Sequence, residues 1–189
     1  LFQLPALLGP FGLALQNMGD IDQQTIAGAT STGTHGTGLA FGGLATRIRA
    51  ATLVTAFGDI LRVSSTENPE LLPAVSLGIG ALGILVDVTI ECVPAFSIEA
   101  VERKETLDVV LDEWLERAAG PDHFEFYTWP HAAGVLTKSN TRLEAGAATE
   151  PLGALKGWVD DVFMANYVLS GFLRLGSLVP PLVPGTNKL

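Results

Sequence analysis

The sequence is poor in the residues that build disulfides, zinc sites and nucleic-acid surfaces. One cysteine, Cys92, stands among 189 residues, which excludes an internal disulfide and any metal site built from several cysteines. The three histidines lack the spacing of a zinc-binding helix, so no metal is expected. Lysine and arginine total 11 against 20 acidic residues, for a net charge of −9. A nucleic-acid partner is therefore not expected.

The chain also lacks a start signal and a clear membrane span. It begins at Leu1 without a methionine, a signal peptide or a basic presequence, so we expect an internal fragment or a processed product. A transmembrane helix needs about 20 apolar residues. Val162–Val179 approaches that length but contains Asn166 and Arg174. We expect a cytoplasmic protein whose apolar tail packs as a helix, with peripheral membrane association left open.

Small residues, by contrast, crowd one stretch of the chain. Gly19–Gly43 reads GDIDQQTIAGATSTGTHGTGLAFGG, in which the backbone is nearly bare. Glycine permits close approach to the main chain, and successive N–H groups in a turn can bind anions. A diphosphate-containing cofactor fits this description, and so does an ordinary glycine-rich surface loop. No lysine follows the glycines, and their order is not G-x-G-x-x-G, so neither a P-loop nor a Rossmann turn is predicted.

Residues up to 94 are predicted to form short elements around this stretch. Asn68 and Pro69 have the types that begin a helix, and the glycines Gly78, Gly80 and Gly83 would let the backbone approach another surface. The predicted elements are a β-prone segment Thr25–Thr30, a hairpin Arg47–Ser64, a helix Glu70–Leu77 and a largely buried strand Leu82–Val93.

After Pro94 the pattern becomes strand, helix, strand, strand, which is typical of an α+β unit. The helix presents an apolar face with Val110 and Trp114. The predicted ranges are Phe96–Glu102, Thr106–Ala119, His123–Trp129 and Gly134–Lys138. The polar residues His131, Lys138, Asn140 and Arg142 fit a sugar pocket or a solvated strand face, and the sequence leaves both open.

Three stretches in order resemble one enzyme family. Residues 19–38, residues 78–84 with 88–94, and residues 124–131 with 136–142 are similar to the FAD-linked sugar-lactone oxidases. They resemble that family's glycine-rich segment, its second flavin-contacting strand and the opening of its substrate domain. The family includes L-gulonolactone oxidase and D-arabinono-1,4-lactone oxidase, within the vanillyl-alcohol oxidase type of flavoprotein.

The resemblance implies a fold and a cofactor. The fold class would be α+β: residues 1–94 would be the second half of a PCMH-type FAD-binding domain, and residues 95–189 the start of an α+β substrate (cap) domain. His35 is expected to border FAD with its main chain rather than to carry a proton. The residues expected to contact FAD are Thr25, Gly28, Thr30, Gly33, Thr34, His35, Gly36 and Ile84.

The implied reaction is oxidation of an aldono-1,4-lactone by hydride transfer to flavin N5, with oxygen or a cytochrome as electron acceptor. No catalytic residue is assigned, because the family's N-terminal phosphate-binding loop and its catalytic cap residues have no counterpart in this sequence. The segment is therefore expected to be inactive alone. Two alternatives stay open: an alditol oxidase with the same flavin fold, and a non-catalytic, truncated flavin-fold module.

Overall fold

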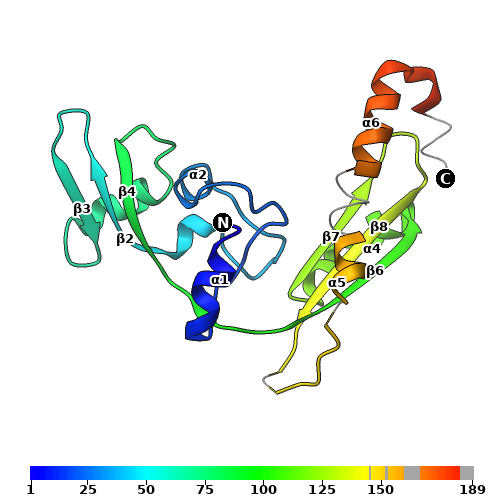
Figure 1. Ribbon diagram of the computed structural model, residues 1–189, viewed down its shortest axis with the longest axis horizontal. Helices are drawn as coiled ribbons and strands as arrows, with labels where there is room; N and C mark the ends of the chain where they lie inside the picture. The colour runs from blue at the N-terminus through cyan, green and yellow to red at the C-terminus, as the bar shows by residue number, and fades with distance from the viewer. Residues whose placement is uncertain (145, 152, 160–166, 184–189) are drawn as a thin grey trace. The chain divides into compact units, whose positions relative to one another are not determined.

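A computed structural model describes residues 1–144, 146–151, 153–159 and 167–183. The chain divides into two compact units, unit 1 (Leu1–Phe96) and unit 2 (Ser97–Leu189), each of which is described by itself (Figure 1).

Unit 1 begins with short elements that lead into the glycine-rich stretch. The helix α1 (Leu4–Leu8) and the 3-10 turn η1 (Gly9–Phe11) precede the strand β1 (Leu13–Ala14). β1 pairs antiparallel with β5 (Val93–Pro94), which lies near the end of the unit in the sequence.

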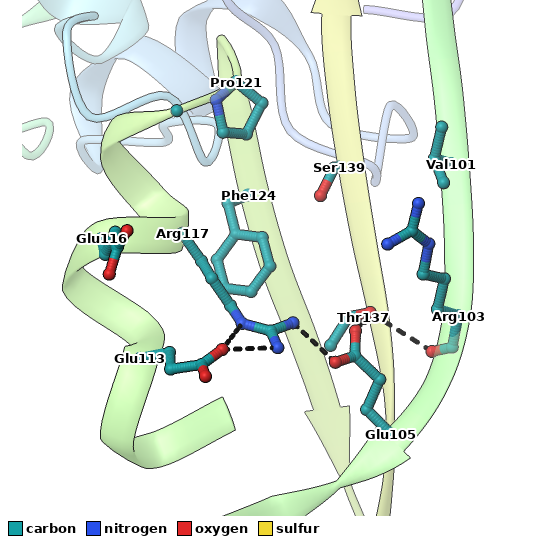
Figure 2. Close-up of a pocket in the computed structure, with 11 residues that line it drawn as sticks. Val101, Arg103, Glu105, Glu113, Glu116, Arg117, Pro121, Phe124, Thr137 and Ser139 are labelled. Carbon is teal, nitrogen blue, oxygen red and sulfur yellow. Dashed lines mark hydrogen bonds and ion pairs between the residues drawn. The ribbon is translucent and has the colours of Figure 1, made fainter. Parts of the chain in front are cut away.

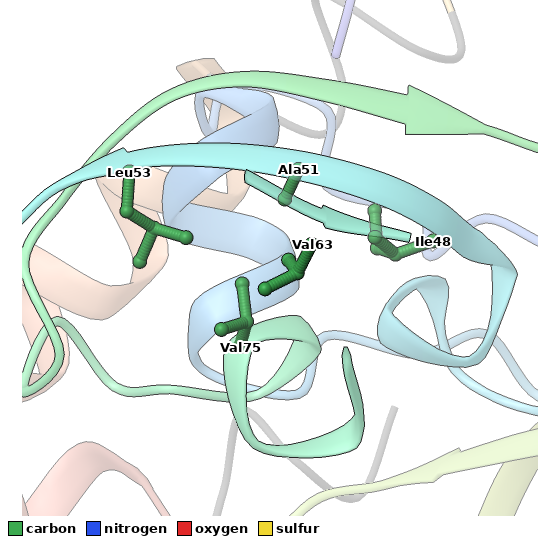
Figure 3. Packing of buried hydrophobic residues seen from close by; sticks show 5 residues of the cluster. All are labelled: Ile48, Ala51, Leu53, Val63 and Val75. Atoms are coloured by element: carbon green, nitrogen blue, oxygen red, sulfur yellow. The ribbon is translucent and has the colours of Figure 1, made fainter. Parts of the chain in front are cut away.

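A three-stranded antiparallel sheet forms the rest of unit 1. β2 (Ile48–Val54) and β3 (Ile60–Ser64) make the predicted hairpin, and β4 (Ile84–Ile90) pairs with the other side of β2. The order is β3-β2-β4. One core cluster joins this sheet to the helix α3 (Leu72–Ser76) and consists of Ile48, Ala51, Leu53, Val63 and Val75 (Figure 3). Burying each of the larger side chains contributes about 1.5–3 kcal/mol.

The predicted β-prone segment Thr25–Thr30 is wrong, because the structure has the helix α2 (Ile26–Ser31) there. Thr25 is its N-cap, with extended backbone angles and a hydroxyl that accepts a hydrogen bond from the N–H of Gly28 at 3.1 Å. Such a cap stabilises a helix by about 1 kcal/mol. α2 leads through a loop to the 3-10 turn η2 (Leu44–Arg47), and Ala29 and Leu44 share a second core cluster with Leu1.

Two further predictions in unit 1 need correction. Asn68 does not cap a helix: it has a positive φ of 50°, and its side chain donates to the carbonyl of Arg62 at 2.8 Å. The predicted helix is also split into η3 (Pro69–Leu71) and α3. The strand β4 is not largely buried, since Ile84 is 73% exposed and Val86 is also exposed. An apolar run predicts a strand, but it does not say which of its faces is covered.

Unit 2 has the predicted order of elements. The strand β6 (Ile98–Thr106) is followed by the helix α4 (Leu107–Ala119), then by β7 (His123–Thr128) and β8 (Gly134–Arg142). The antiparallel sheet has the order β6-β8-β7, so the last strand lies in the middle. β8 is longer than predicted. α4 packs on β6 and β7 through Val110, which is fully buried.

The tail contains α5 (Ala154–Gly157), α6 (Leu169–Leu178) and the 3-10 turn η5 (Pro180–Leu182). The predicted apolar segment Val162–Val179 lies partly outside the described residues, since 160–166 are not described. Within the part that is described, no helix combines the length and the apolar character needed to cross a membrane. Phe172 and Leu173 of α6 are exposed.

Candidate functional site

The hydroxyl groups of α2 are mostly committed to the helix itself. Thr30 is buried, and its hydroxyl donates to the carbonyl of Ile26 at 2.9 Å. Thr32 donates to the carbonyl of Gly28 at 2.8 Å. A threonine held in this way has no free donor for a ligand. The Thr30 hydroxyl can therefore offer a ligand only an acceptor oxygen and no donor.

The glycine-rich loop, residues 33–43, connects α2 to η2. Gly33 begins it with a φ of 75°, a conformation that favours glycine. Main-chain hydrogen bonds fix both ends of the loop. The N–H of Thr34 donates to the carbonyl of Ala29 at 2.9 Å, and the N–H of Leu44 donates to the carbonyl of Thr34 at 3.0 Å. The Thr34 hydroxyl lies 3.2 Å from Oε1 of Gln24. The loop is thus anchored at its base by its own backbone.

Between these two ends of the loop, some main-chain N–H groups have no hydrogen-bond partner among the described residues. The main-chain N–H groups of the four successive residues 35–38 donate no hydrogen bond to any described residue. The ring of His35 does not fill the gap, since its Nδ1 lies 2.9 Å from the carbonyl oxygen of Gly36. His35 and Thr37 are exposed, whereas Gly38 is buried. A run of unpaired backbone N–H groups is suited to a ligand rich in acceptor oxygens.

Gly36 lies directly against a residue that sequence reasoning missed. A Cβ at position 36 would collide with the side-chain amide of Asn17 and come within 2.7 Å of the carbonyl oxygen of Met18. Asn17 is 7% exposed, and its Nδ2 donates to the carbonyl of Gly42 at 3.4 Å. No sequence signal marks Asn17 as buried. It stands after a short apolar stretch and just before Gly19, where a polar residue is usually exposed.

The second glycine segment, residues 78–83, meets the end of α2. The N–H of Ile79 donates to the carbonyl of Ser31 at 3.0 Å. Gly83 lies against the backbone of Val54 with no space for a side chain, so the close approach predicted from these glycines is made to β2. Ile84 follows at the start of β4, and its exposed side chain is open to a partner. The structure therefore joins the first two motifs in one unit.

In unit 2 a cavity of about 540 Å³ lies between α4 and the sheet (Figure 2). Arg117 on α4 binds two carboxylates there: Glu113 at 2.8 Å on its own helix and Glu105 of β6 at 2.7 Å. Oε1 of Glu105 also accepts from the hydroxyl of Thr137 at 2.8 Å. These contacts tie the helix to the sheet.

The electrostatics of this cluster follow from its hydrogen bonds. The Thr137 hydroxyl, and then Arg117, hold the pKa of Glu105 below its ordinary value of 4.5, against the opposing effect of partial burial. The hydrogen bond to Glu113, followed by that to Glu105, raises the pKa of Arg117. Both groups are therefore charged near neutral pH, as a helix-to-sheet ion pair requires.

The polar residues that the sequence left open lie along β8 or just before it. Lys138 pairs with Glu125 of β7, at 3.4 Å. The amide oxygen of Asn140 is buried and accepts no hydrogen bond from the described residues. His131 is exposed in the turn between the strands, with a φ of 68°. Among the residues that the structure describes, no group of three or more potential ligand side chains is placed to hold a metal ion.

The pattern that defines the D-arabinono-1,4-lactone oxidase family matches residues 88–189, more than half of the chain. The chain belongs to this family. It is 37% identical to the L-gulonolactone oxidase of Scyliorhinus torazame over 182 residues, which is 96% of this chain and 40% of that protein. It is 36% identical over 130 residues to the D-arabinono-1,4-lactone oxidase of Yarrowia lipolytica, covering 69% of this chain and 25% of that protein.

A solved structure shows the same fold. A cholesterol oxidase from Brevibacterium sterolicum, which has the PCMH-type FAD-binding fold, matches with a TM-score of 0.73 at 16% identity. The match covers 96% of this chain and 38% of that one. The α+β fold class predicted from the sequence is confirmed. The chain spans about two fifths of the length of the first of these relatives, so the activity of the whole protein is a matter for proposal.

Proposed function

We propose that the full-length protein containing this segment is an FAD-dependent oxidoreductase that oxidises an aldono-1,4-lactone by hydride transfer to flavin N5. The observation that carries the proposal is the run of four unpaired main-chain N–H groups at residues 35–38, in a chain of the lactone oxidase family. FAD presents diphosphate, ribityl and ring oxygens as acceptors, and such N–H groups bind acceptors without side-chain rearrangement.

The residues around the loop fit this cofactor. Residues 33–38 of the loop include three glycines, and Gly36 packs so closely on Asn17 and Met18 that a methyl group would not fit there. Where glycine leaves the main chain uncovered, a flat or extended ligand can approach it directly. The exposed side chain of Ile84, in the same unit, adds apolar surface of the kind that a ring system covers.

In this proposal the residues of the segment bind and orient rather than react. FAD supplies the redox chemistry by accepting the hydride. N–H groups among residues 35–38 donate to its oxygens. Thr25 contributes indirectly, because its hydroxyl already caps α2 and so fixes the helix from which the loop departs. No residue of the segment is assigned a proton-transfer role.

The test is the visible spectrum of the purified full-length protein. Flavin absorption that is bleached anaerobically by L-gulono- or D-arabinono-1,4-lactone supports the proposal. Flavin that responds to a polyol such as xylitol but not to lactones replaces it with an alditol oxidase. A colourless protein that does not bind added FAD rejects it and favours a non-catalytic module.

We propose oxygen or a cytochrome as the electron acceptor. Reoxidation of the reduced flavin by oxygen or by cytochrome c separates the two candidate acceptors. We propose a cytoplasmic protein with peripheral membrane association, supported by exposed apolar residues of α6, among them Phe172, Leu173 and Leu178. Co-sedimentation of the full-length protein with liposomes, compared with a Phe172→Ser/Leu173→Ser variant, tests the membrane contact.

A further inference from the structure

Asn17 joins two points of the glycine-rich loop that are far apart along the loop. Its Nδ2 donates to the carbonyl of Gly42 at 3.4 Å, and the same amide is in contact with Gly36. The neighbouring Gly19 packs in the same way, since a Cβ there would lie 3.0 Å from the carbonyl oxygen of His35. The segment 17–19 therefore forms the floor of the loop.

The amide of Asn17 is only half satisfied. Its Oδ1 is buried and accepts no hydrogen bond from any residue that the structure describes. A buried acceptor without a partner destabilises the folded state, and folded proteins contain few of them. An apolar side chain of similar shape would avoid this penalty at position 17. Asparagine at this position therefore calls for a reason other than the stability of the ligand-free chain.

Unpaired donors lie in the adjacent part of the loop. The N–H groups of residues 35–38 have no partner among the described residues, and Gly36 is both one of these donors and the residue packed on Asn17. An unpaired acceptor next to unpaired donors is the pattern expected of a site whose hydrogen bonds are completed when a ligand arrives.

We propose that Asn17 is a positioning residue for the FAD-binding loop, and that its Oδ1 accepts a hydrogen bond only in the FAD-loaded protein. This rests on the proposed function. The residue acts through the loop: Nδ2 holds the Gly42 end, while Oδ1, which lies against Gly36, accepts from the one N–H of residues 35–38 that does not donate to FAD. Asn17 is separate from the eight residues that the sequence predicts to contact FAD.

The experiment compares Asn17→Leu with wild type in the full-length protein, stripped of flavin and then titrated with FAD. Leucine branches at the same carbon as asparagine, so it keeps the shape and removes both polar atoms. The Nδ2 bond is at the long limit, so its loss has little effect on the apoprotein. We expect the melting temperature of the apoprotein to be unchanged or higher. The Kd for FAD should rise about tenfold, which is the effect expected from losing one hydrogen bond.

Asn140→Leu is the matched control, because Asn140 in unit 2 also has a buried Oδ1 that no described residue satisfies. It should leave the Kd for FAD unchanged. An Asn17→Leu variant that binds FAD as wild type does would overturn the inference. So would an apoprotein that melts lower in proportion to its weaker binding, since that is the behaviour of a merely structural residue. A wild-type protein that binds no FAD removes the proposed function and this inference together, whereas normal wild-type binding with an unaffected variant removes the inference alone.

Discussion

The glycine-rich loop of unit 1 and the ion cluster between α4 and the sheet of unit 2 differ in how far their polar groups are hydrogen-bonded. In the loop, N–H donors and the Asn17 oxygen have no partner among the described residues. In the cluster, three nitrogens of Arg117 bind the carboxylates of Glu105 and Glu113, and Thr137 donates to Glu105 (Figure 2). Polar groups that are all paired within the protein stabilise the fold, whereas unpaired polar groups are available to a ligand.

The two regions should therefore respond differently to substitution. Changes in the loop should weaken cofactor binding more than stability, and changes in unit 2 should lower stability while leaving the cofactor in place. Substitutions in the full-length protein test this difference, and Gly36→Ala is expected to have the largest effect and Glu91→Gln the smallest.

Gly36→Ala should have the largest effect. The added methyl group would collide with the Asn17 amide and the Met18 carbonyl, both of which belong to the floor of the loop. Displacing a loop by about 1 Å can weaken its function on the order of a hundredfold, so we expect the protein to purify without flavin. Overpacking should also lower the free energy of unfolding by about 1–3 kcal/mol.

The matched control for that prediction is Gly9→Ala. Gly9 has no atom within 4 Å of the position of an added Cβ, and its φ is −51°. It should keep wild-type flavin content, measured as the ratio of visible to ultraviolet absorbance. Equal flavin content in Gly36→Ala and Gly9→Ala would contradict the assignment of the loop as the cofactor site.

Val110→Ala should lower stability without loss of flavin. Val110 is fully buried between α4 and the sheet, and removing two methyl groups from such a site costs about 2 kcal/mol. Val109→Ala, on the exposed side of the same helix, should change the free energy of unfolding by less than about 0.5 kcal/mol. Urea unfolding of both variants measures the difference, and loss of flavin from Val110→Ala at low temperature would break the proposed separation of the two units.

Sequence reasoning succeeded where hydrophobic period decides the structure. The alternation in β2 and β3 and the apolar face of α4 predicted those elements, because a buried face imposes its period on the sequence. It failed at residues 25–30, where single hydrogen bonds decide: Thr25 caps α2, and Thr30 bonds back to Ile26. β-branched residues in a short segment favour a strand only until such local bonds are available.

The candidate site was predicted in outline and missed in detail. The glycine-rich composition located the loop, but composition does not distinguish the bonded hydroxyl of Thr30 from the unbonded N–H of Gly36. It gave no sign of Asn17, whose role depends on burial and on contact with residues 19 and 25 positions away in the sequence. That contacts with FAD are made by the predicted residues stays a prediction.

Thr137→Val should have a smaller effect that depends on pH. Thr137 is buried, and its hydroxyl is the largest cause of the lowered pKa of Glu105. A carboxyl whose pKa is lowered by folding stabilises the protein above its unfolded pKa, and this stabilisation is lost as pH falls through the folded pKa. Valine removes the hydroxyl, which should cost about 1 kcal/mol near neutral pH and raise the pKa of Glu105 toward its ordinary value.

The measurement is the difference in melting temperature between about pH 7 and about pH 3, which brackets the titration of a carboxyl. It should be smaller for Thr137→Val than for wild type, because less stability remains to be lost on acidification. Glu105→Gln serves as the control, since glutamine does not titrate. Adding Thr137→Val to Glu105→Gln should leave the pH dependence unchanged, and a further change in that double variant would show that another group is responsible.

Glu91→Gln should have the smallest effect, although its cluster has the charge pattern of the unit 2 cluster with the signs reversed. Glu91 lies between Arg47, at 2.9 Å, and Arg49, just as Arg117 lies between two carboxylates. Its side chain is 42% exposed, however, against 19% for Glu105. Exposed ion pairs contribute up to about 1 kcal/mol, and salt screens them. The loss in unfolding free energy should therefore be smaller for Glu91→Gln than for Glu105→Gln, and it should shrink between about 0.05 M and about 1 M salt. An equal or larger, salt-independent loss would mean that ion-pair composition, rather than burial, sets the strength of these clusters.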